Sequence, residues 1–348
     1  PALFHCHDWT SAFLPCALAW HRHYRRVGGR SVITLHNVAY QGILEREPFM
    51  EASGLEPWSF NMEAMEFYGQ VNLLKGAIVS ANAVTTVSPS YAREIQTYES
   101  TRELSGVIYK QRHKLSGILN GIDTGYWNPE TDPHIPEKFS AQKLNGKMRA
   151  REELMRRAGF QPHSPEPVAV CVSRLVEQKG FSLILSALDA LPELGAKFVF
   201  LGSGHSWIED ALQKAGERWP DTVRFFQGYD EPLSHLLYAG GDVFLMPSVF
   251  EPCGLSQMIA MRYGTIPLVR EVGGLRDTVT DVDSPKGGNG FTFQTCDTAG
   301  MLWALRRAIV RFGEVKAWNE IRVRAMHEDF TWNRSALLYK ALYEKTLR

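Results

Sequence analysis

The sequence has few cysteines, no long apolar run and no net charge. Its five cysteines are scattered and form no C-x-x-C pair, which argues against a disulfide framework or a zinc site and favours a reducing compartment. No apolar run approaches the roughly 20 residues that span a bilayer. Because 38 basic residues balance 38 acidic ones, no net field attracts the chain to nucleic acid or to an anionic membrane.

Several catalytic motifs are also missing. The sequence contains no G-x-S-x-G nucleophile motif, no Walker loop and no zinc-type ligand spacing. What is present is a globular composition, with 44% hydrophobic and 22% charged residues, in a chain of 348 residues. That length is enough for two domains.

Apolar runs predict an α/β fold. In the second half, six such runs alternate with helical patterns, which is typical of a parallel sheet covered on both faces. The first half supplies only three predicted strands before Lys114. The predicted strands are 3–5, 31–35 and 83–87, then 168–172, 198–201, 223–226, 243–246, 266–269 and 290–293.

Three further segments carry structural expectations. Residues 11–26 have a helical pattern that Gly28-Gly29 would end. Residues 39–69 look irregular and rich in aromatics and glycine, which suggests a loop or lid beside a site. Residues 331–348 form a predicted amphipathic helix, with Leu337, Leu338, Ala341 and Leu342 on its apolar side.

The chain is organised around the stretch VFLMPSVFEPCGLSQMIAMRYGT, residues 243–265. A buried strand ends at Pro247, Glu251 follows in a bend, and a helical pattern begins after Gly254. Such a bend is where open α/β sheets bind ligands, because free N–H groups attract phosphate and glycine allows close approach. The alternative is a helix-initiating turn with a solvated glutamate.

Other polar residues follow predicted strands. His5-Cys6-His7-Asp8 could bind a metal, but His5 and His7 share one face of a strand while Asp8 points to the other. A structural role and a site role for Asp8 both stay open. His36 ends the next strand and is either a site residue or a satisfied core histidine.

Two basic residues follow the strand at 168–172. Arg174 and Lys179 lie five apart across a turn and could clamp a diphosphate with charge-assisted hydrogen bonds, or belong to a solvated basic loop. Gly202, in Gly202-Ser203-Gly204, is compatible with nucleotide approach, although a lone G-x-G is weak. Gly273-Gly274 repeats the anion-site pattern, also weakly.

Together these stretches resemble bacterial glycogen synthase and plant starch synthase. The matching segments run in unbroken order over nearly the whole chain: HCHDW, TLHNVAYQG, VSPSYA, LNGIDTGYWNPETD, VSRLVEQKG, LGSG, SVFEPCGLSQM, YGTIPLVR and GGLRDTV. The resemblance implies a GT-B fold, in which two Rossmann-like, doubly wound domains face a cleft and a C-terminal helix returns to the first domain. It also implies transfer of glucose from ADP-glucose to the non-reducing end of an α-1,4-glucan, with retention and without a metal or cofactor.

The resemblance assigns catalytic roles residue by residue. Arg174 and Lys179 would neutralise the departing diphosphate, and Glu251 would bind glucose hydroxyls and steady an oxocarbenium-like transition state. His36 would contact the transferred glucose, and Asp8 would lie close to the reacting centre.

The same resemblance assigns donor contacts. Tyr229 would pack on the adenine, Asn120 would reach the sugar from the junction of the two halves, and Gly202 belongs to the donor side. Four residues of one loop would present a helix start to glucose and phosphate: Cys253, Gly254, Leu255 and Ser256.

Two departures from the family pattern shape the expectations. Ile259 stands where the wider GT-B group often has a second glutamate. Starch synthases also lack this glutamate. The family's N-terminal K-x-G-G-L stretch has no match, so we expect an N-terminally truncated chain with an incomplete first domain, which is inactive alone. The predicted domains are residues 1–117, 118–328 and the returning helix 329–348, in the cytoplasm or a plastid stroma.

Two rival functions remain. One is a sucrose-forming or other GT-B sugar-nucleotide transferase, which the joint presence of E-P-C-G-L and H-N-V-A-Y-Q-G disfavours. The other is a non-catalytic glucan-binding or scaffolding homologue, against which Glu251, Arg174, Lys179 and His36 argue.

Overall fold

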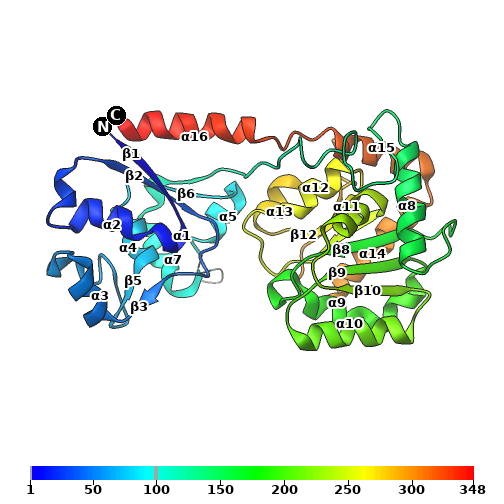
Figure 1. The fold of residues 1–348 in the computed structure, drawn as a ribbon, viewed down its shortest axis with the longest axis horizontal. Helices are drawn as coiled ribbons and strands as arrows, with labels where there is room; N and C mark the ends of the chain where they lie inside the picture. The colour runs from blue at the N-terminus through cyan, green and yellow to red at the C-terminus, as the bar shows by residue number, and fades with distance from the viewer. Residues whose placement is uncertain (1, 98–100) are drawn as a thin grey trace. The chain divides into compact units, whose positions relative to one another are not determined.

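The structure, a computed structural model, describes residues 2–97 and 101–348, and the chain divides into two units. Unit 1 holds the residues up to Asn120 together with Trp332–Arg348, and unit 2 holds Gly121–Thr331. Figure 1 shows the chain leaving unit 1, building unit 2 and ending in a helix of unit 1. No helix of the described residues is long and apolar enough to cross a membrane.

Unit 1 contains a parallel sheet of four strands in the order β1-β2-β6-β7. Three of these strands precede Lys114, as the sequence predicts, and a fourth follows it. β1 forms one edge of the sheet. The strands are β1 (Leu3–His7), β2 (Arg30–Leu35), β6 (Ala83–Thr86) and β7 (Leu115–Gly117).

Two predictions for unit 1 are wrong in detail. The expected helix 11–26 ends at Trp20, because His21 takes an extended conformation (φ −80°, ψ 132°). Residues 39–69 are not an irregular loop, since they supply a helix and two strands of a small antiparallel sheet ordered β3-β5-β4. Besides the strands of the four-stranded sheet, the strands and α-helices described in residues 2–120 are β3 (Ile43–Leu44), β4 (Glu66–Phe67), β5 (Gln70–Asn72), α1 (Asp8–Ser11), α2 (Phe13–Trp20), α3 (Arg46–Ser53), α4 (Leu73–Ser80), α5 (Pro89–Glu94) and α7 (Ser105–Lys110).

The C-terminal helix α16 (Trp332–Leu347) forms as predicted, but it buries a different face. Leu337 is 68% exposed and Leu338 is 51% exposed. The buried contact is instead polar: Ser335 donates to the carbonyl of Leu119, and the Tyr343 hydroxyl lies 2.7 Å from Nδ1 of His5. The amphipathic pattern misleads here because hydrogen bonds and the ring contacts of Tyr339 and Tyr343 with His5, rather than Leu337 and Leu338, attach this helix to unit 1.

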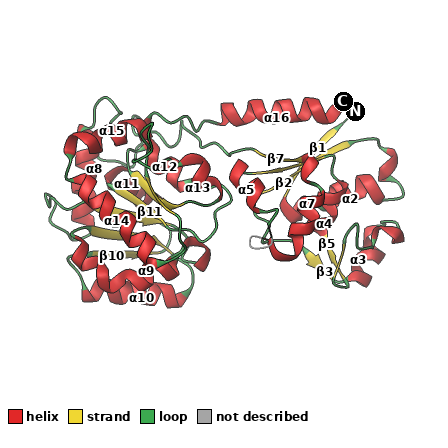
Figure 2. Cartoon of the chain, turned by 180° about the vertical axis from the view of Figure 1, so that it is seen from behind, coloured by secondary structure: helices red, strands yellow, loops and turns green. Residues whose placement is uncertain are grey.

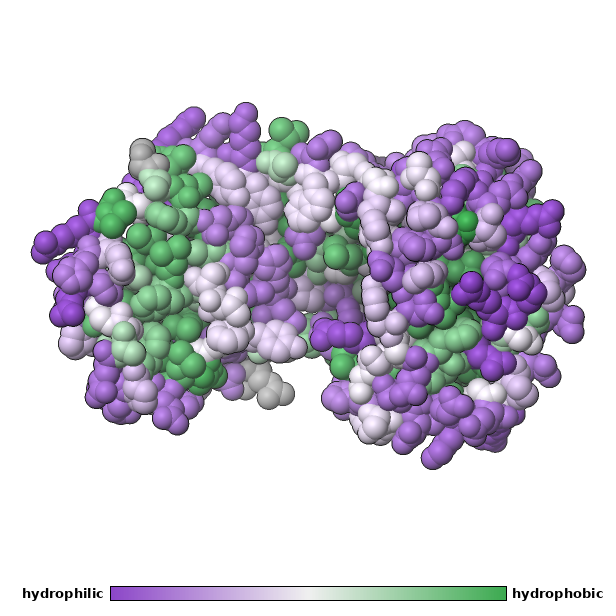
Figure 3. Space-filling view, viewed as in Figure 1, coloured by the Kyte–Doolittle hydropathy of each residue, from purple (hydrophilic) through white to green (hydrophobic). Residues whose placement is uncertain are grey.

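Helix α2 is apolar on most of its surface and only partly covered. Pro15, Cys16 and Trp20 are buried, while Phe13 and Leu14 on the same helix are half-buried. Figure 3 shows apolar side chains gathered on the side of unit 1 that carries α2. An exposed apolar face beside an edge strand is an aggregation liability.

Unit 2 contains a parallel sheet of six strands in the order β10-β9-β8-β11-β12-β13, and all six predicted strands form. Figure 2 shows helices on both faces of this sheet. The strands are β8 (Val168–Val172), β9 (Lys197–Gly202), β10 (Val223–Gln227), β11 (Val243–Met246), β12 (Ile266–Arg270) and β13 (Phe291–Phe293). The helices are α8 (Asn145–Arg157), α9 (Phe181–Ala187), α10 (Ser206–Arg218), α11 (Glu231–Gly240), α12 (Ser256–Arg262), α13 (Gly273–Thr278), α14 (Thr298–Phe312) and α15 (Val315–Met326).

The central strands of unit 2 are buried on both faces. In β8, Ala169 and Cys171 belong to the core that α9, α10 and α14 cover, while the alternate residues Val168 and Val170 face the opposite layer and are fully buried. Helix starts are fixed by caps: the Asp230 carboxylate accepts from the N–H of Leu233 at 2.9 Å to begin α11. The helices packed on the two faces of the sheet therefore fix the positions of the carboxyl ends of its strands.

Candidate active site

The strand order of unit 2 reverses between β8 and β11. The chain adds β9 and β10 on one side of β8 and then returns to place β11, β12 and β13 on the other side. Ligands of open α/β sheets bind at such a point, outside the carboxyl ends of the strands. A cavity of about 210 Å³ lies there, lined by residues from the ends of both strands and by the polar side chains of Arg174, Lys179 and Ser256.

The two loops that follow β8 and β11 are fastened to each other. The N–H of Val249 donates to the carbonyl of Gln178 at 2.8 Å, and Nε2 of Gln178 donates to the carbonyl of Phe250 at 3.4 Å. Gly180 has φ +78°, and a Cβ there would lie 1.9 Å from the carbonyl oxygen of Pro247. Only glycine fits this contact, so the sequence K-G is needed to bring the basic loop against the glutamate loop.

Glu251 is buried, with 5% of its surface exposed. Its Oε2 accepts from Nζ of Lys179 at 2.6 Å and from the hydroxyl of Ser248 at 3.2 Å, and its own carbonyl accepts from the N–H of Gly274 at 3.0 Å. Oε1 has no partner within the described ranges and remains available to a hydroxyl. A solvated glutamate in a turn, the alternative left by the sequence, does not describe this geometry.

Arg174 differs from Lys179 in its surroundings. Its side chain is exposed, lines the same cavity and makes no hydrogen bond or ion pair within residues 2–97 and 101–348. The guanidinium is therefore free to take an anionic ligand, whereas the Lys179 ammonium already has a carboxylate partner. The sequence predicts one clamp made of both residues. In the structure, only Lys179 of the two has a protein partner, and only Arg174 is unpaired within the described ranges.

The glycines near the site have packing reasons of their own. A Cβ on Gly202 would lie 1.9 Å from the carbonyl oxygen of Ser173, and a Cβ on Gly204 would lie 2.2 Å from that of Leu175. These two glycines let the loop carrying Arg174 run beside the end of β9. A donor contact of Gly202 stays a prediction.

The Cys253–Ser256 segment leads into α12. Cys253 is buried, Gly254 has φ +73°, Leu255 is 46% exposed and Ser256 lines the cavity. A side chain that the sequence analysis missed holds this segment: Nε2 of Gln257 donates to the carbonyl of Gly254 at 2.9 Å. Its position in the first turn of α12 was the available signal.

The two remaining donor residues, Tyr229 and Asn120, are not among the residues that line this cavity. Tyr229 follows β10 and Gly228 and is 84% exposed, so its ring is open to a flat ligand. Asn120 ends the first of the two stretches of unit 1 and is half-buried, with no hydrogen-bond partner in the part of the chain that the structure describes. Their donor roles stay predictions.

Unit 1 brings Asp8 and His36 together at the carboxyl ends of β1 and β2. The backbone N–H of His36 donates to Oδ1 of Asp8 at 2.7 Å, and Asp8 itself has φ +53°. Nδ1 of His7 lies 3.0 Å from Nε2 of His36, so one ring holds the proton that the other accepts. The sequence analysis did not assign His7 to the site, although its spacing from His5 placed it on the same strand face.

His5 is engaged on both ring nitrogens. Nδ1 contacts the Tyr343 hydroxyl, Nε2 lies 2.6 Å from the Thr34 hydroxyl, and the ring stacks on His7 at 4.4 Å. Burial, followed by the neighbouring His7 and His36 rings, lowers the pKa of His5 to about 4. Burial and the His36 ring also lower the pKa of His7, against the opposite effect of Asp8. No cluster of three or more His, Cys, Asp or Glu residues within the described ranges is arranged to hold a metal ion.

Known families match both units. A model of the starch synthase catalytic domain matches residues 1–110, and a model of group 1 glycosyl transferases matches residues 155–311. The glycogen synthase of Anaeromyxobacter sp. (strain Fw109-5) is 44% identical over 348 residues, which cover 99% of this chain and 72% of that protein. The chain belongs to the glycogen and starch synthase family.

Further members of this family agree. The glycogen synthase of Thermus thermophilus is 44% identical over 346 residues, covering 99% of this chain and 73% of the relative. The catalytic domain of starch synthase IV from Arabidopsis thaliana, solved bound to ADP and acarbose, is 40% identical with a TM-score of 0.92, covering 99% of this chain and 73% of that chain. The chain therefore has the GT-B fold of this synthase family, and it is a glycosyltransferase by family.

A more distant structure separates fold from family. Sucrose-phosphate synthase from Thermosynechococcus elongatus has a TM-score of 0.63 over 99% of this chain and 73% of its own, but only 17% identity. That likeness shows the fold alone. The sucrose-forming alternative gains no support from it, because the whole-chain identity lies with glycogen synthases.

Proposed function

We propose that this chain carries the donor site and the catalytic groups of a transferase that moves glucose from ADP-glucose to the non-reducing end of an α-1,4-glucan, with retention. The observation that carries the proposal is the cavity at the strand-order reversal of unit 2, which Arg174 and Lys179 line and where Lys179 is paired with the buried Glu251. The adenine nucleotide is supported by the starch synthase IV relative, which was solved with ADP.

The proposed chemistry follows from these charges. The bond between glucose C1 and the diphosphate oxygen breaks, and C1 forms a bond to the acceptor hydroxyl oxygen on the same face of the sugar. The hydroxyl proton passes to the departing ADP or to water. Negative charge grows on the diphosphate, where Arg174 and Lys179 stabilise it, while Glu251 stabilises the positive charge on the sugar ring.

The groups of unit 1 have proposed roles in holding the sugar. The His36 ring would contact the transferred glucose, and Asp8 orients the His36 backbone through its 2.7 Å hydrogen bond. These are positioning interactions, and they act on where the glucose sits rather than on the departing diphosphate.

Calorimetry with ADP-glucose and UDP-glucose tests the donor assignment on this chain. We expect saturable binding of ADP-glucose that exceeds UDP-glucose, and a loss of roughly 10-fold or more in Arg174→Ala, the scale of one charge-assisted hydrogen bond. Equal or stronger binding of UDP-glucose would overturn the adenine preference. Binding that Arg174→Ala leaves unchanged would move the donor away from this cavity.

Two assays, binding of the protein to glycogen and incorporation of labelled glucose into glycogen, separate the synthase from a glucan-binding homologue. A synthase binds both ADP-glucose and glucan, and its label is released as maltose by a β-amylase, which cuts from non-reducing ends. A homologue that binds glycogen but no ADP-glucose fits the non-catalytic alternative. The incorporation assay also tests the sequence-based expectation that residues 1–348 alone do not turn over, which a rate comparable to a complete synthase would contradict.

A further inference from the structure

A second cavity lies at the opposite edge of the unit 2 sheet, and the proposed function does not use it. It has a volume of about 350 Å³, within the range of small-molecule sites. Asp242 lines it and immediately precedes β11, whereas Ser248 and Glu251 follow that same strand. The two cavities therefore lie towards opposite ends of β11.

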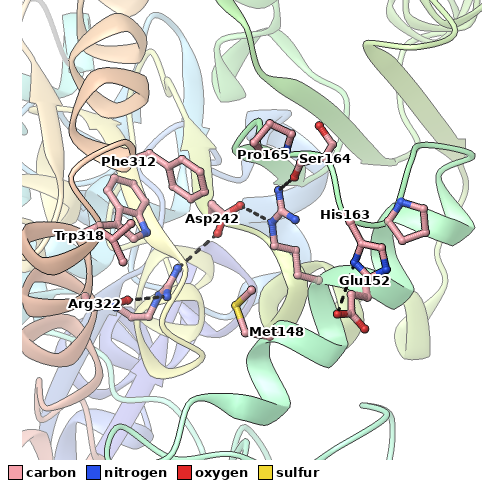
Figure 4. Close-up of a pocket in the computed structure, with 13 residues that line it drawn as sticks. Met148, Glu152, His163, Ser164, Pro165, Asp242, Phe312, Trp318 and Arg322 are labelled. Atoms are coloured by element: carbon pink, nitrogen blue, oxygen red, sulfur yellow. Dashed lines mark hydrogen bonds and ion pairs between the residues drawn. The ribbon is translucent and has the colours of Figure 1, made fainter.

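The walls of this cavity are mainly apolar. Figure 4 shows Phe312 and Trp318 together on one side and Met148 and Pro165 on others. Phe312 and Trp318 meet edge to face, with ring centroids 5.3 Å apart. Met148 is 52% exposed and Val315 is 70% exposed, so apolar side chains reach solvent where the cavity opens.

The floor of the cavity is charged. Nε of Arg151 donates to Oδ2 of Asp242 at 3.0 Å, and Nη2 of Arg322 donates to Oδ1 at 3.3 Å. Oδ2 also accepts from the backbone N–H of Val168 at 3.0 Å, and Asp242 is 2% exposed. One carboxylate thus serves two permanent cations, because a guanidinium does not lose its proton in proteins. Of the lining acids, Glu152 is already paired with Arg149 at 2.9 Å.

One buried hydrogen-bond donor at this floor has no acceptor in the described residues. Nε1 of Trp318 is buried and has no acceptor within residues 2–97 and 101–348, and Figure 4 shows this nitrogen turned towards Asp242 and Arg322. Nη1 of Arg151 also has no partner in that part of the chain, while Nη2 is used by the carbonyls of Ser164 and Glu166. A buried donor without an acceptor is costly, and both oxygens of Asp242 are taken.

We propose that this cavity binds a small organic anion, with an apolar body against Phe312 and Trp318 and a carboxylate or phosphate group at the floor. The apolar walls favour a hydrocarbon or aromatic body, and the spare N–H donors beside two guanidinium groups favour acidic oxygens. A neutral molecule would satisfy the walls and leave the charge of the floor unmatched. Inorganic phosphate would match the charge of the floor but would leave the apolar walls without a contact.

Phenyl phosphate, titrated into the whole chain with its donor site saturated by ADP, tests this proposal. We expect saturable binding that is tighter than that of either phenol or inorganic phosphate under the same conditions. In a ¹H–¹⁵N spectrum, the indole resonance that disappears in Trp318→Phe should move downfield as its N–H gains an acceptor. Trp318→Phe itself should weaken the binding while it keeps the aromatic wall.

Two exposed valines provide a matched pair of variants. Val315 and Val310 are both 70% exposed and lie on neighbouring helices, but only Val315 lines the cavity. Glutamate at position 315, the first residue of α15, is also compatible with the helix N-terminus. Val315→Glu should weaken phenyl phosphate by roughly 5- to 10-fold through charge repulsion, and Val310→Glu should leave it unchanged.

The proposal would be overturned by the absence of saturable binding, by binding of phenol as tight as that of phenyl phosphate, or by equal effects of the two valine variants. Loss of phenyl phosphate binding when ADP is added would place the anion at the donor cavity instead. None of these outcomes depends on glucose transfer, so the proposed function stands or falls separately.

Discussion

Lys179 and Arg174 illustrate how two basic residues of one motif differ once their contacts are known. Lys179 is mostly buried and pairs with Glu251 at 2.6 Å, while Arg174 is exposed and makes no protein contact of that kind within the described ranges. A position in the sequence shows that both follow the same strand. It does not show which of them a neighbouring loop will reach.

Arg174→Ala and Lys179→Ala should therefore differ in stability although both weaken donor binding. Each variant removes one proposed hydrogen-bond donor to the diphosphate, and the loss of one such group lowers kcat by about 10²–10³. Arg174→Ala should leave the melting temperature of unit 2 unchanged, whereas Lys179→Ala leaves a buried carboxylate unpaired and should cost about 1–3 kcal/mol. Thermal unfolding of both variants checks this difference, and equal melting temperatures would show that the ion pair does not stabilise the loops.

Glu251 should be required as a carboxylate. Glu251→Gln keeps the shape and the hydrogen bond from Ser248 but removes the charge that is proposed to face a cationic sugar, so transfer should fall far more than donor affinity. The comparison needs incorporation rates and ADP-glucose calorimetry on the same preparation, in a version extended to the length of the relatives, because residues 1–348 alone are expected to be inactive. Turnover above half of the parent rate would reduce Glu251 to a turn residue.

His5 should make the stability of unit 1 depend on pH. Its pKa falls from 6.5 to about 4 on folding, so between these values the unfolded chain binds the proton and the folded chain does not. Stability is then complete above pH 6.5 and decreases as the pH falls towards 4, by at most about 1–2 kcal/mol after solvent screening. Denaturant unfolding of unit 1 at several pH values should show this slope. His5→Gln should flatten it and the exposed His113→Gln should not.

At the scale of elements, loop contacts decide the site. Gly180 and Gly195 both have a left-handed conformation, with φ +78° and +69°. A Cβ at 180 would collide with the Pro247 carbonyl, and a Cβ at 195 would meet nothing within 4 Å. Gly195→Ala should cost only about 1 kcal/mol of backbone strain.

Gly180→Ala should cost clearly more than its control and should also weaken ADP binding. The collision separates the basic loop from the glutamate loop, which removes the preorganised charge pair. Chemical denaturation and ADP calorimetry on both variants test this. If the two alanine variants lose the same stability and bind ADP alike, the close contact between the loops is not what shapes the site.

The elements also show how far sequence patterns reach. Fully buried strands such as 168–172 and 243–246 are predictable because their apolar runs are bounded by turn residues, and the site residues after them follow from strand order. The segment 39–69 escapes this logic, since strands of two or three residues carry no periodicity. The ion pair of Lys179 and the ring contact of His7 escape it as well, because both join loops or strands that are distant in sequence.

At the scale of the whole molecule, unit 1 is built from two separate stretches of sequence. Helix α16 joins it through the contacts of Ser335 with Leu119 and of Tyr343 with His5. Leu337 and Leu338 do not provide this attachment, since both are exposed. The structure thus corrects a pattern that looked decisive in the sequence.

Deleting residues 332–348 should destabilise unit 1 and spare unit 2. Each unit has its own sheet, so calorimetric unfolding is expected to show two transitions, of which only the one assigned to unit 1 should shift downward. ADP binding to the deletion variant reports on unit 2 independently. A shift of both transitions, or lost ADP binding, would show that the units unfold as one.

The Lys179–Glu251 contact has a consequence for how the site behaves before the donor arrives. Without a ligand, the Lys179 ammonium already has an internal counter-ion, the Glu251 carboxylate 2.6 Å away. Under the proposed function, an arriving diphosphate would compete with Glu251 for Lys179, and binding of the diphosphate would release Oε2 from its ion-pair partner. The event that seats the proposed leaving group would then also free the carboxylate for the sugar, so that negative charge on the diphosphate and positive charge on the sugar ring are stabilised together.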